Sequence, residues 1–376
     1  MHRRAFLQTV GAVAALPQAA RAQSTAGDGI LLGFDTYSVR AFDWKDIQLL
    51  DYAAGLGVDT VQISSSGDYS SLDPAHLSKV RDHAAQLGIR IDAGIGCICP
   101  LSKSWNSKEG PAPQKVVDGL KVAKAVGARS MRCFMGSSAD RRGSRPIEEL
   151  MESTIGVFRA VRSQALDLGV KIALENHAGD MQAREVRTII EESGKDFVGS
   201  CLDTGNPMWV MENPLVTLEV LGPYALTTHV RDSVVFEHPR GAAAQWVALG
   251  DGDVDWPAFL ALYRKLCPAA LLQLEIITGR PPQVLPYYDR DWWKWFPKTP
   301  ASEFVRFEEM ARNGRPFMGT MVIEDAPGAK PPEYTAALRE QQRIDLERSL
   351  EYAKNQLGLG VRSRPGLEPF TRHRTN

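Results

Sequence analysis

The most informative stretch of the sequence is Lys171-Ile-Ala-Leu-Glu175-Asn-His177. A short apolar run that ends in a carboxylate, an amide and an imidazole is typical of a buried strand whose end meets a polar site. The same pattern returns three times: Cys201-Leu-Asp203-Thr-Gly-Asn206, Leu226-Thr-Thr-His229-Val-Arg231-Asp232 and Leu271-Leu-Gln-Leu-Glu275-Ile-Ile277. Each interval between these stretches is long enough for a crossover helix, so we expect four successive parallel strands.

Strand-like and helix-like segments alternate along the rest of the chain. Four earlier strands are predicted at 30–34, 60–63, 90–95 and 129–134, and helices at 44–55, 74–87, 114–126, 147–168, 183–193, 214–221 and 256–266. A Leu-Gly or Val-Gly step follows each of the first four helices, where glycine readily ends a helix. Eight alternations between residues 30 and 278 predict an α/β fold, a (β/α)8 TIM barrel, as a single domain over residues 29–358. A doubly wound sheet is the alternative, and fewer strands would have favoured it.

The N-terminus has the pattern of an export signal. Arg3 and Arg4 precede an apolar run over residues 10–16, and Ala20-Arg-Ala22 is a small-x-small cleavage site. The segment 1–22 resembles a twin-arginine signal peptide, which implies an exported protein, periplasmic or extracellular. The apolar run is too short to span a bilayer, so we expect no stable membrane insertion.

Composition narrows the class of protein further. Apolar residues make up 44% of the chain and charged residues 24%, enough to bury a large core. The formal net charge of -1 argues against a nucleic-acid partner and against an acidic membrane surface. The cysteines number five, and because Cys97, Cys133 and Cys201 lie in strand-like runs, we predict reduced core residues.

In a barrel, the carboxyl ends of the strands bring their side chains to one mouth. Glu175, Asp203, His229 and Glu275 should therefore converge there. Three carboxylates and one imidazole predict a site for one divalent metal, with Mn, Mg or Co preferred and Zn acceptable. Taken singly, each residue could equally be a salt-bridged strand end or a helix cap. Four on consecutive strands favour the metal site.

With these motifs, together with Gly250-Asp-Gly-Asp-Val-Asp-Trp256, the chain resembles the xylose-isomerase-like superfamily of sugar isomerases and epimerases. The resemblance implies a carbohydrate substrate and a metal held by Glu175, Asp203, His229 and Glu275. It also implies that Glu175 and Glu275 move protons as an acid/base pair. A metal that binds a substrate carbonyl and a neighbouring hydroxyl would stabilise an enediolate, which leads to epimerisation or isomerisation.

The chain departs from ketose 3-epimerases around this core. Met181, Asn206 and Val235 stand where those enzymes have Glu, His and Arg. The local candidates for substrate binding are His177, Asn206, Arg231 and Asp232, each of which could instead support a neighbour.

These departures leave other functions open. The main alternative is a metal-dependent lyase or decarboxylase of a 3-keto sugar or sugar acid, and another is a non-catalytic sugar-binding barrel. Apurinic endonucleases of the superfamily need many histidines, whereas this chain has seven in all and only His177 and His229 at strand ends. That scarcity, with the near-zero net charge, argues against a DNA substrate.

The segments after the eighth strand are less regular. An aromatic insertion at about 279–300 could be a lid over the mouth or a subunit contact in a homo-oligomer. We expect the eighth helix at 302–311, an amphipathic closing helix at 337–356 and a flexible tail at 359–376. The basic loop Arg141-Arg-Gly-Ser-Arg145 is predicted to be solvated. Asp255 and Pro257 predict the start of a helix rather than a calcium loop.

Overall fold

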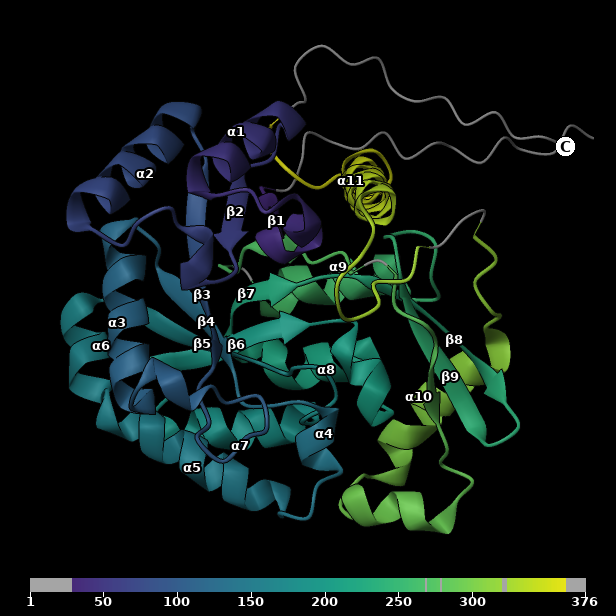
Figure 1. Cartoon of the computed structure of the whole chain (residues 1–376). Helices are drawn as coiled ribbons and strands as arrows, with labels where there is room; N and C mark the ends of the chain where they lie inside the picture. The colour runs from purple at the N-terminus through teal and green to yellow at the C-terminus, as the bar shows by residue number, and fades with distance from the viewer. Residues whose placement is uncertain (1–28, 268, 278, 320–322, 363–376) are drawn as a thin grey trace, which may run out of the picture.

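Eight parallel strands form the centre of the protein. The structure is a computed structural model that describes residues 29–362 except 268, 278 and 320–322. The strand order is β10-β1-β2-β3-β4-β5-β6-β7, and parallel bridges Thr227 to Leu271 and Val230 to Leu274 close the ring between β7 and β10. The predicted (β/α)8 barrel is therefore confirmed (Figure 1). The strands are β1 (Leu32–Asp35), β2 (Thr60–Ile63), β3 (Arg90–Cys97), β4 (Ser130–Phe134), β5 (Lys171–Glu175), β6 (Val198–Asp203), β7 (Ala225–His229) and β10 (Leu272–Leu274). The predicted signal, residues 1–22, lies outside the described residues.

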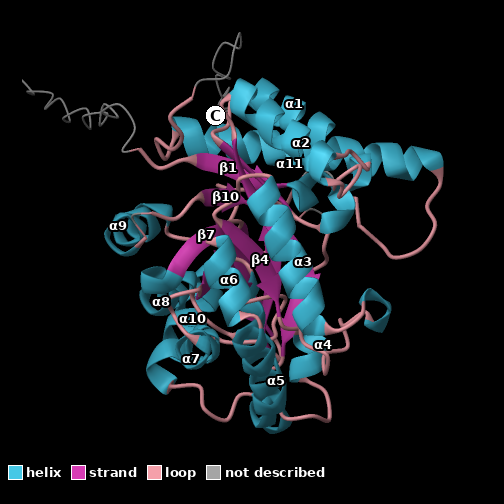
Figure 2. Cartoon of the chain, turned by 90° about the vertical axis from the view of Figure 1, so that its left-hand side faces the viewer, coloured by secondary structure: helices cyan, strands magenta, loops and turns pink. Residues whose placement is uncertain are grey.

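Helices surround the strands on the outside (Figure 2). Four predicted helices have the bounds found in the structure, and the predicted helix 147–168 is interrupted at Val161, where the backbone leaves helical geometry. Glycines with positive φ, such as Gly88 at +67°, end the helices before the next strand. The helices of the barrel layer are α1 (Asp46–Leu56), α2 (Pro74–Leu87), α3 (Ala112–Ala125), α4 (Ser138–Arg141), α5 (Ile147–Ala160), α6 (Arg162–Leu168), α7 (Ala183–Ser193), α8 (Pro214–Leu221) and α9 (Trp256–Leu266).

A small antiparallel sheet, which the sequence analysis missed, stands beside the barrel mouth. Strand β9 (Gly241–Val247) pairs with β8 (Asp232–His238) on one side and with β11 (Gln283–Leu285) on the other. Gly241, at a φ of +143°, allows the tight connection from β8 to β9. The segments before α9 and after β10 are thereby joined into one structure above the ends of β7 and β10. At the start of α9, Asp255 accepts a hydrogen bond from the Ala258 N–H, as predicted.

The helix predicted at 302–311 is not the eighth barrel helix. It forms α10 (Ala301–Asn313), which packs against β8 and β9. The closing helix, α11 (Pro332–Asn355), takes the place beside α1 instead (Figures 1 and 2). Lys354 Nζ donates to the carbonyl oxygens of Leu56 and Gly57 at 2.9 and 2.6 Å. Beyond it, the first part of the predicted tail is bound to the barrel, because the Gly360 N–H donates to the Ile30 carbonyl.

The aromatic insertion is attached to the barrel rim. Besides β11 it contains a 3-10 helix, η6 (Arg290–Trp295). The Trp292 indole N–H contacts the Met211 sulfur at 3.1 Å, and Thr299 Oγ1 donates to Gln182 Oε1 at 3.1 Å. Among its aromatic side chains only Tyr288 is largely exposed, at 64%. The insertion is thus held against the barrel rim by intramolecular contacts.

The structure confirms one further sequence prediction and contradicts another. All five cysteines are free and buried, as predicted. Arg141, predicted in a solvated loop, is instead buried and pairs with Glu185.

None of the described helices is both long and apolar enough to cross a membrane.

Candidate metal centre

Four side chains from four strands meet at the barrel mouth. Glu175, Asp203 and His229 are the last residues of β5, β6 and β7, and Glu275 follows β10 directly. Asp203 pairs with His229 in the register of β6 and β7, which places them at the same height. One potential ligand atom from each of the four residues lies within 4.8 Å of the other three. The structure thus brings together the four residues predicted as metal ligands.

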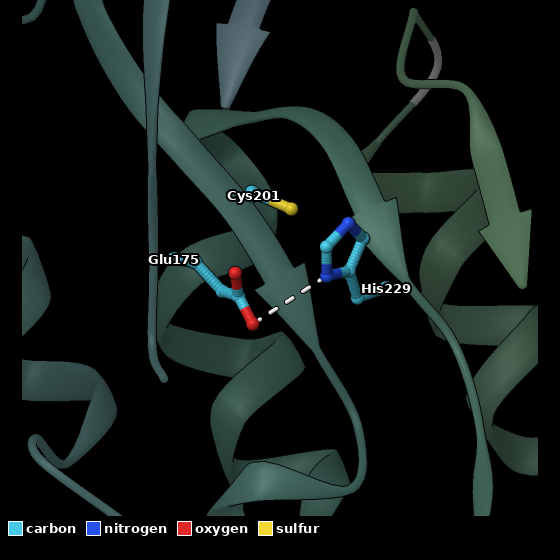
Figure 3. Close-up of side chains that lie close together, drawn as sticks. All are labelled: Glu175, Cys201 and His229. Atoms are coloured by element: carbon cyan, nitrogen blue, oxygen red, sulfur yellow. Dashed lines mark ion pairs between the residues drawn. The ribbon is translucent and has the colours of Figure 1, made fainter. Parts of the chain in front are cut away.

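The histidine of this cluster has one nitrogen free for a ligand bond. His229 Nε2 lies 2.5 Å from Gln62 Oε1, a contact that makes Nε2 the donor and directs the Nδ1 lone pair inward. Nδ1 is buried, has no hydrogen-bond partner among the residues that the structure describes, and lies 3.4 Å from Glu175 Oε1 and 3.3 Å from Glu275 Oε2. Figure 3 shows the imidazole and the Glu175 carboxylate pointing toward one another. An unpartnered nitrogen among carboxylate oxygens fits a divalent cation.

Cys201 forms a second, overlapping group with Glu175 and His229 (Figure 3). It lies two residues before Asp203 on β6, and therefore faces the same side of the strand one step deeper in the barrel. Burial raises the pKa of the Cys201 thiol to about 12. The oxygen-rich set with Asp203 and Glu275 is therefore the better site for a hard cation.

Two buried arginines hold the carboxylates of the cluster. Arg132, from β4, donates to Glu175 Oε2, and Arg231, just after β7, bridges Asp203 and Glu275. Burial alone would raise the pKa of Glu175, but the positive charge of Arg132 outweighs it, and the pKa falls to about 2. Arg231 likewise holds the pKa of Glu275 well below its usual value, so both glutamates are ionised at neutral pH. The sequence analysis missed Arg132, although an arginine inside an apolar strand run is itself a signal of a buried charge pair.

Besides Arg231, two more of the predicted substrate-binding residues lie next to the cluster. Asn206 Nδ2 donates to Glu175 Oε1 at 3.1 Å, while Asn206 Oδ1 is buried and has no hydrogen-bond partner among the described residues. The half-buried His177 stacks on Phe134 at 3.8 Å between ring centroids. Its Nδ1 lies 2.7 Å from the Gly136 carbonyl oxygen, which leaves Nε2 as the nitrogen available to a ligand.

Asp232, the remaining candidate, faces a different structure. Its carboxylate accepts hydrogen bonds from the Ser233 and Gly250 N–H groups, each at 2.9 Å, and from Trp256 Nε1 at 2.8 Å. Burial raises its pKa to about 6. Asp232 thus anchors the loop between β9 and α9, and the structure does not bring it to the cluster.

The sequence is similar to that of a known protein family and of a characterised relative. Residues 50–286 match the family described as xylose isomerase-like TIM barrel. The chain belongs to this family. It is 24% identical over 244 residues to a 3-oxo-isoapionate decarboxylase of Pectobacterium atrosepticum, an alignment that covers 60% of this chain and 78% of the relative.

Solved structures share the fold at low sequence identity. A D-psicose 3-epimerase crystallised in the presence of D-fructose superposes with a TM-score of 0.56 at 16% identity, covering 88% of this chain and all of that one. A 3-keto-D-glucoside 4-epimerase from E. coli superposes with a TM-score of 0.52 at 15% identity, covering 72% of this chain and all of that one.

Two of the three positions predicted to depart from ketose 3-epimerases carry buried apolar side chains. Met181 is buried, and Val235 is buried within β8 of the added sheet. The polar groups beside the cluster include those of Gln62, Arg132, Asn206, Arg231 and His177.

Proposed function

We propose that this protein is a divalent-metal-dependent enzyme that acts on a sugar or sugar derivative through an enediolate. The observation that supports it most is the meeting of Glu175, Asp203, His229 and Glu275 within 4.8 Å, with a vacant nitrogen on His229. A cation bound there would act as a Lewis acid, polarising a carbonyl and offsetting negative charge on its oxygen. We favour proton transfer, by an isomerase or epimerase, as the first candidate reaction.

The two glutamates are placed to act from different sides. Glu175 belongs to β5 and Glu275 follows β10, and β6 and β7 separate these strands in the barrel. One carboxylate can remove a proton from carbon while the other returns a proton to the opposite face. Arg132 and Arg231 orient the carboxylates and share their charge.

Burial protects the reaction. The four proposed ligands are buried, and even Glu275 is only 4% exposed. The absence of bulk water around the cluster strengthens the electrostatic interactions and limits stray protonation of an enediolate.

Decarboxylation of a 3-oxo sugar acid is the second candidate. Each glutamate is already paired with an arginine. The positive charge of the arginine stabilises the ionised carboxylate and so makes the glutamate a weaker base toward a C–H bond. Loss of carbon dioxide from a 3-oxo acid generates the same enediolate without a base that attacks carbon, and needs only a later proton donor. The similarity to a 3-oxo-isoapionate decarboxylase supports this candidate.

The experiment compares the metal-loaded wild type with Glu275→Gln and with Glu212→Gln, a buried glutamate outside the cluster that bonds to Thr217. Each protein is incubated in D2O with aldoses, ketoses and 3-keto sugar acids. We expect deuterium in a sugar carbon with the wild type and Glu212→Gln but not with Glu275→Gln. The labelled product then distinguishes epimer, isomer and decarboxylated sugar. Absence of both metal and exchange in the wild type would leave a sugar-binding barrel.

We also infer export, because paired arginines, an apolar run and a small-residue cleavage site occur in that order within residues 1–22. Fractionation of cells expressing the full chain, beside Arg3→Lys/Arg4→Lys, tests it. Cytoplasmic retention of the wild type would contradict export.

A further inference from the structure

Arg231 is held in a stack of planar groups at the barrel mouth. Its guanidinium carbon lies 4.5 Å from the centroid of the Trp246 ring, and that ring is stacked on Trp209 at 4.2 Å with an interplanar angle of 5°. Trp246 belongs to β9 of the added sheet, whereas Trp209 lies in η4 (Asn206–Val210), which follows β6. The stack therefore joins the sheet to the barrel rim directly beside the metal centre.

Three N–H donors of this stack have no acceptor. Arg231 Nε, Trp246 Nε1 and Trp209 Nε1 are buried atoms without a hydrogen-bond partner among the described residues. The side chains of Arg231 and Trp246 are 1% and 7% exposed. Leaving a buried donor unpaired is costly, and proteins rarely leave several at one place unless a ligand pairs with them.

Two acceptors near the centre are also unpaired. Asn206 Oδ1 and Asp35 Oδ2 are buried and have no hydrogen-bond partner in the part of the chain that the structure describes, and Asp35 Oδ2 lies 3.4 Å from His229 Nε2. Hydroxyl groups are the donors that suit both oxygens. The unpaired groups together call for a ligand with hydroxyl donors at one end and a strong acceptor at the other.

The three unpaired N–H donors indicate which functional group of a ligand would bind there. A ketone or hydroxyl oxygen offers two lone pairs, whereas a carboxylate offers two oxygens with about four lone-pair sites and a charge that suits arginine.

We propose that Arg231, Trp246 and Trp209 form the subsite for the carboxylate of a polyhydroxy acid, so that the substrate is a sugar acid rather than a neutral sugar. This inference rests on the proposed function, since it names the substrate class of the same centre. The added sheet is then a specificity element, because it contributes Trp246 to a site whose other residues come from the barrel.

The test is calorimetric binding of D-gluconate and D-glucitol, which have the same carbon chain and lack a carbonyl that could react. The proteins are the Mn²⁺-loaded wild type, Trp246→Phe, and Trp293→Phe as a control whose indole N–H already donates to the Tyr287 carbonyl. Phenylalanine keeps an aromatic ring in the stack and removes the N–H. We expect the wild type and Trp293→Phe to prefer gluconate, and Trp246→Phe to lose roughly tenfold of that preference at unchanged metal content.

Equal affinity of the wild type for the two ligands would overturn the proposal. An unchanged preference in Trp246→Phe would also overturn it, because gluconate would then be selected by the metal alone. If Trp246→Phe does not fold, Trp209→Phe provides the same comparison. Metal content and deuterium exchange, measured on the same samples, report separately on the proposed function, so an exchanging enzyme without a gluconate preference would refute only the carboxylate subsite.

Discussion

Replacing Arg132 by methionine is expected to destabilise the protein strongly when it holds no metal and less when it does. Arg132 and Glu175 are 5% and 0% exposed, and their ion pair lies inside the barrel. Removing one partner of a buried pair leaves the other charge uncompensated, which costs about 3–5 kcal/mol. In Arg132→Met, a divalent cation beside Glu175 would supply part of the lost positive charge, so metal should recover a substantial part of that free energy.

The assay is urea unfolding of the wild type and Arg132→Met, each in EDTA and in saturating Mn²⁺. Arg145→Met is the control, because its pair with Glu149 is exposed on α5 and such pairs contribute about 0.5 kcal/mol or less. The double variant Arg132→Met/Glu175→Gln should regain most of the stability in EDTA, since neither charge of this pair remains. An equal loss of free energy with and without Mn²⁺ would refute the reasoning, because the cation would then not share the charge of Glu175.

Three further predictions concern groups around the centre. Burial raises the pKa of Glu212 to about 7 from an ordinary value near 4.5. Between these two pH values the folded chain therefore holds a proton that the unfolded chain has released. The free energy of unfolding should consequently fall as pH rises through this range. The shift corresponds to about 3 kcal/mol, and urea unfolding at pH 5 and pH 8 should show a loss of stability that is larger in the wild type than in Glu212→Gln. A Cβ on Gly205 would approach Arg231 Nε to 2.4 Å. Gly205→Ala should therefore lower the free energy of unfolding by about 1–3 kcal/mol and weaken Mn²⁺ binding. Unchanged Mn²⁺ binding would show that Arg231 is not fixed there. Because all five cysteines are free and buried, thiol reagents should react slowly with the folded chain and with five groups after unfolding, and fewer groups would indicate a disulfide.

The parts of the fold that follow from local pattern were predictable. Apolar runs such as Lys171–Glu175 form strands, and glycines such as Gly88 end helices, because both depend on few neighbouring residues. The four proposed ligands could be found for the same reason: each stands at the end of an apolar run, and barrel topology brings such ends together.

Features that depend on distant partners could not be predicted. The strand β9 contains Ala242, Ala243 and Ala244, residues with little strand preference, and its pairing with β8 and β11 is decided by tertiary contacts. Periodicity predicted helices near 302–311 and 337–356 but cannot say which strands each one packs against, and so α10 was wrongly assigned as the eighth barrel helix. Asp232 stands at a strand end like the proposed ligands, yet four donors of its own loop hold its carboxylate.

The central claim is that Glu175, Asp203, His229 and Glu275 hold one divalent cation. A Mn²⁺ titration followed by electron paramagnetic resonance, with Asp203→Asn and Glu212→Gln beside the wild type, tests it most directly. We predict one bound ion per chain in the wild type and in Glu212→Gln, and an affinity weakened roughly tenfold or more in Asp203→Asn. Equal affinity in Asp203→Asn and the wild type, or no bound ion in the wild type, would contradict the claim.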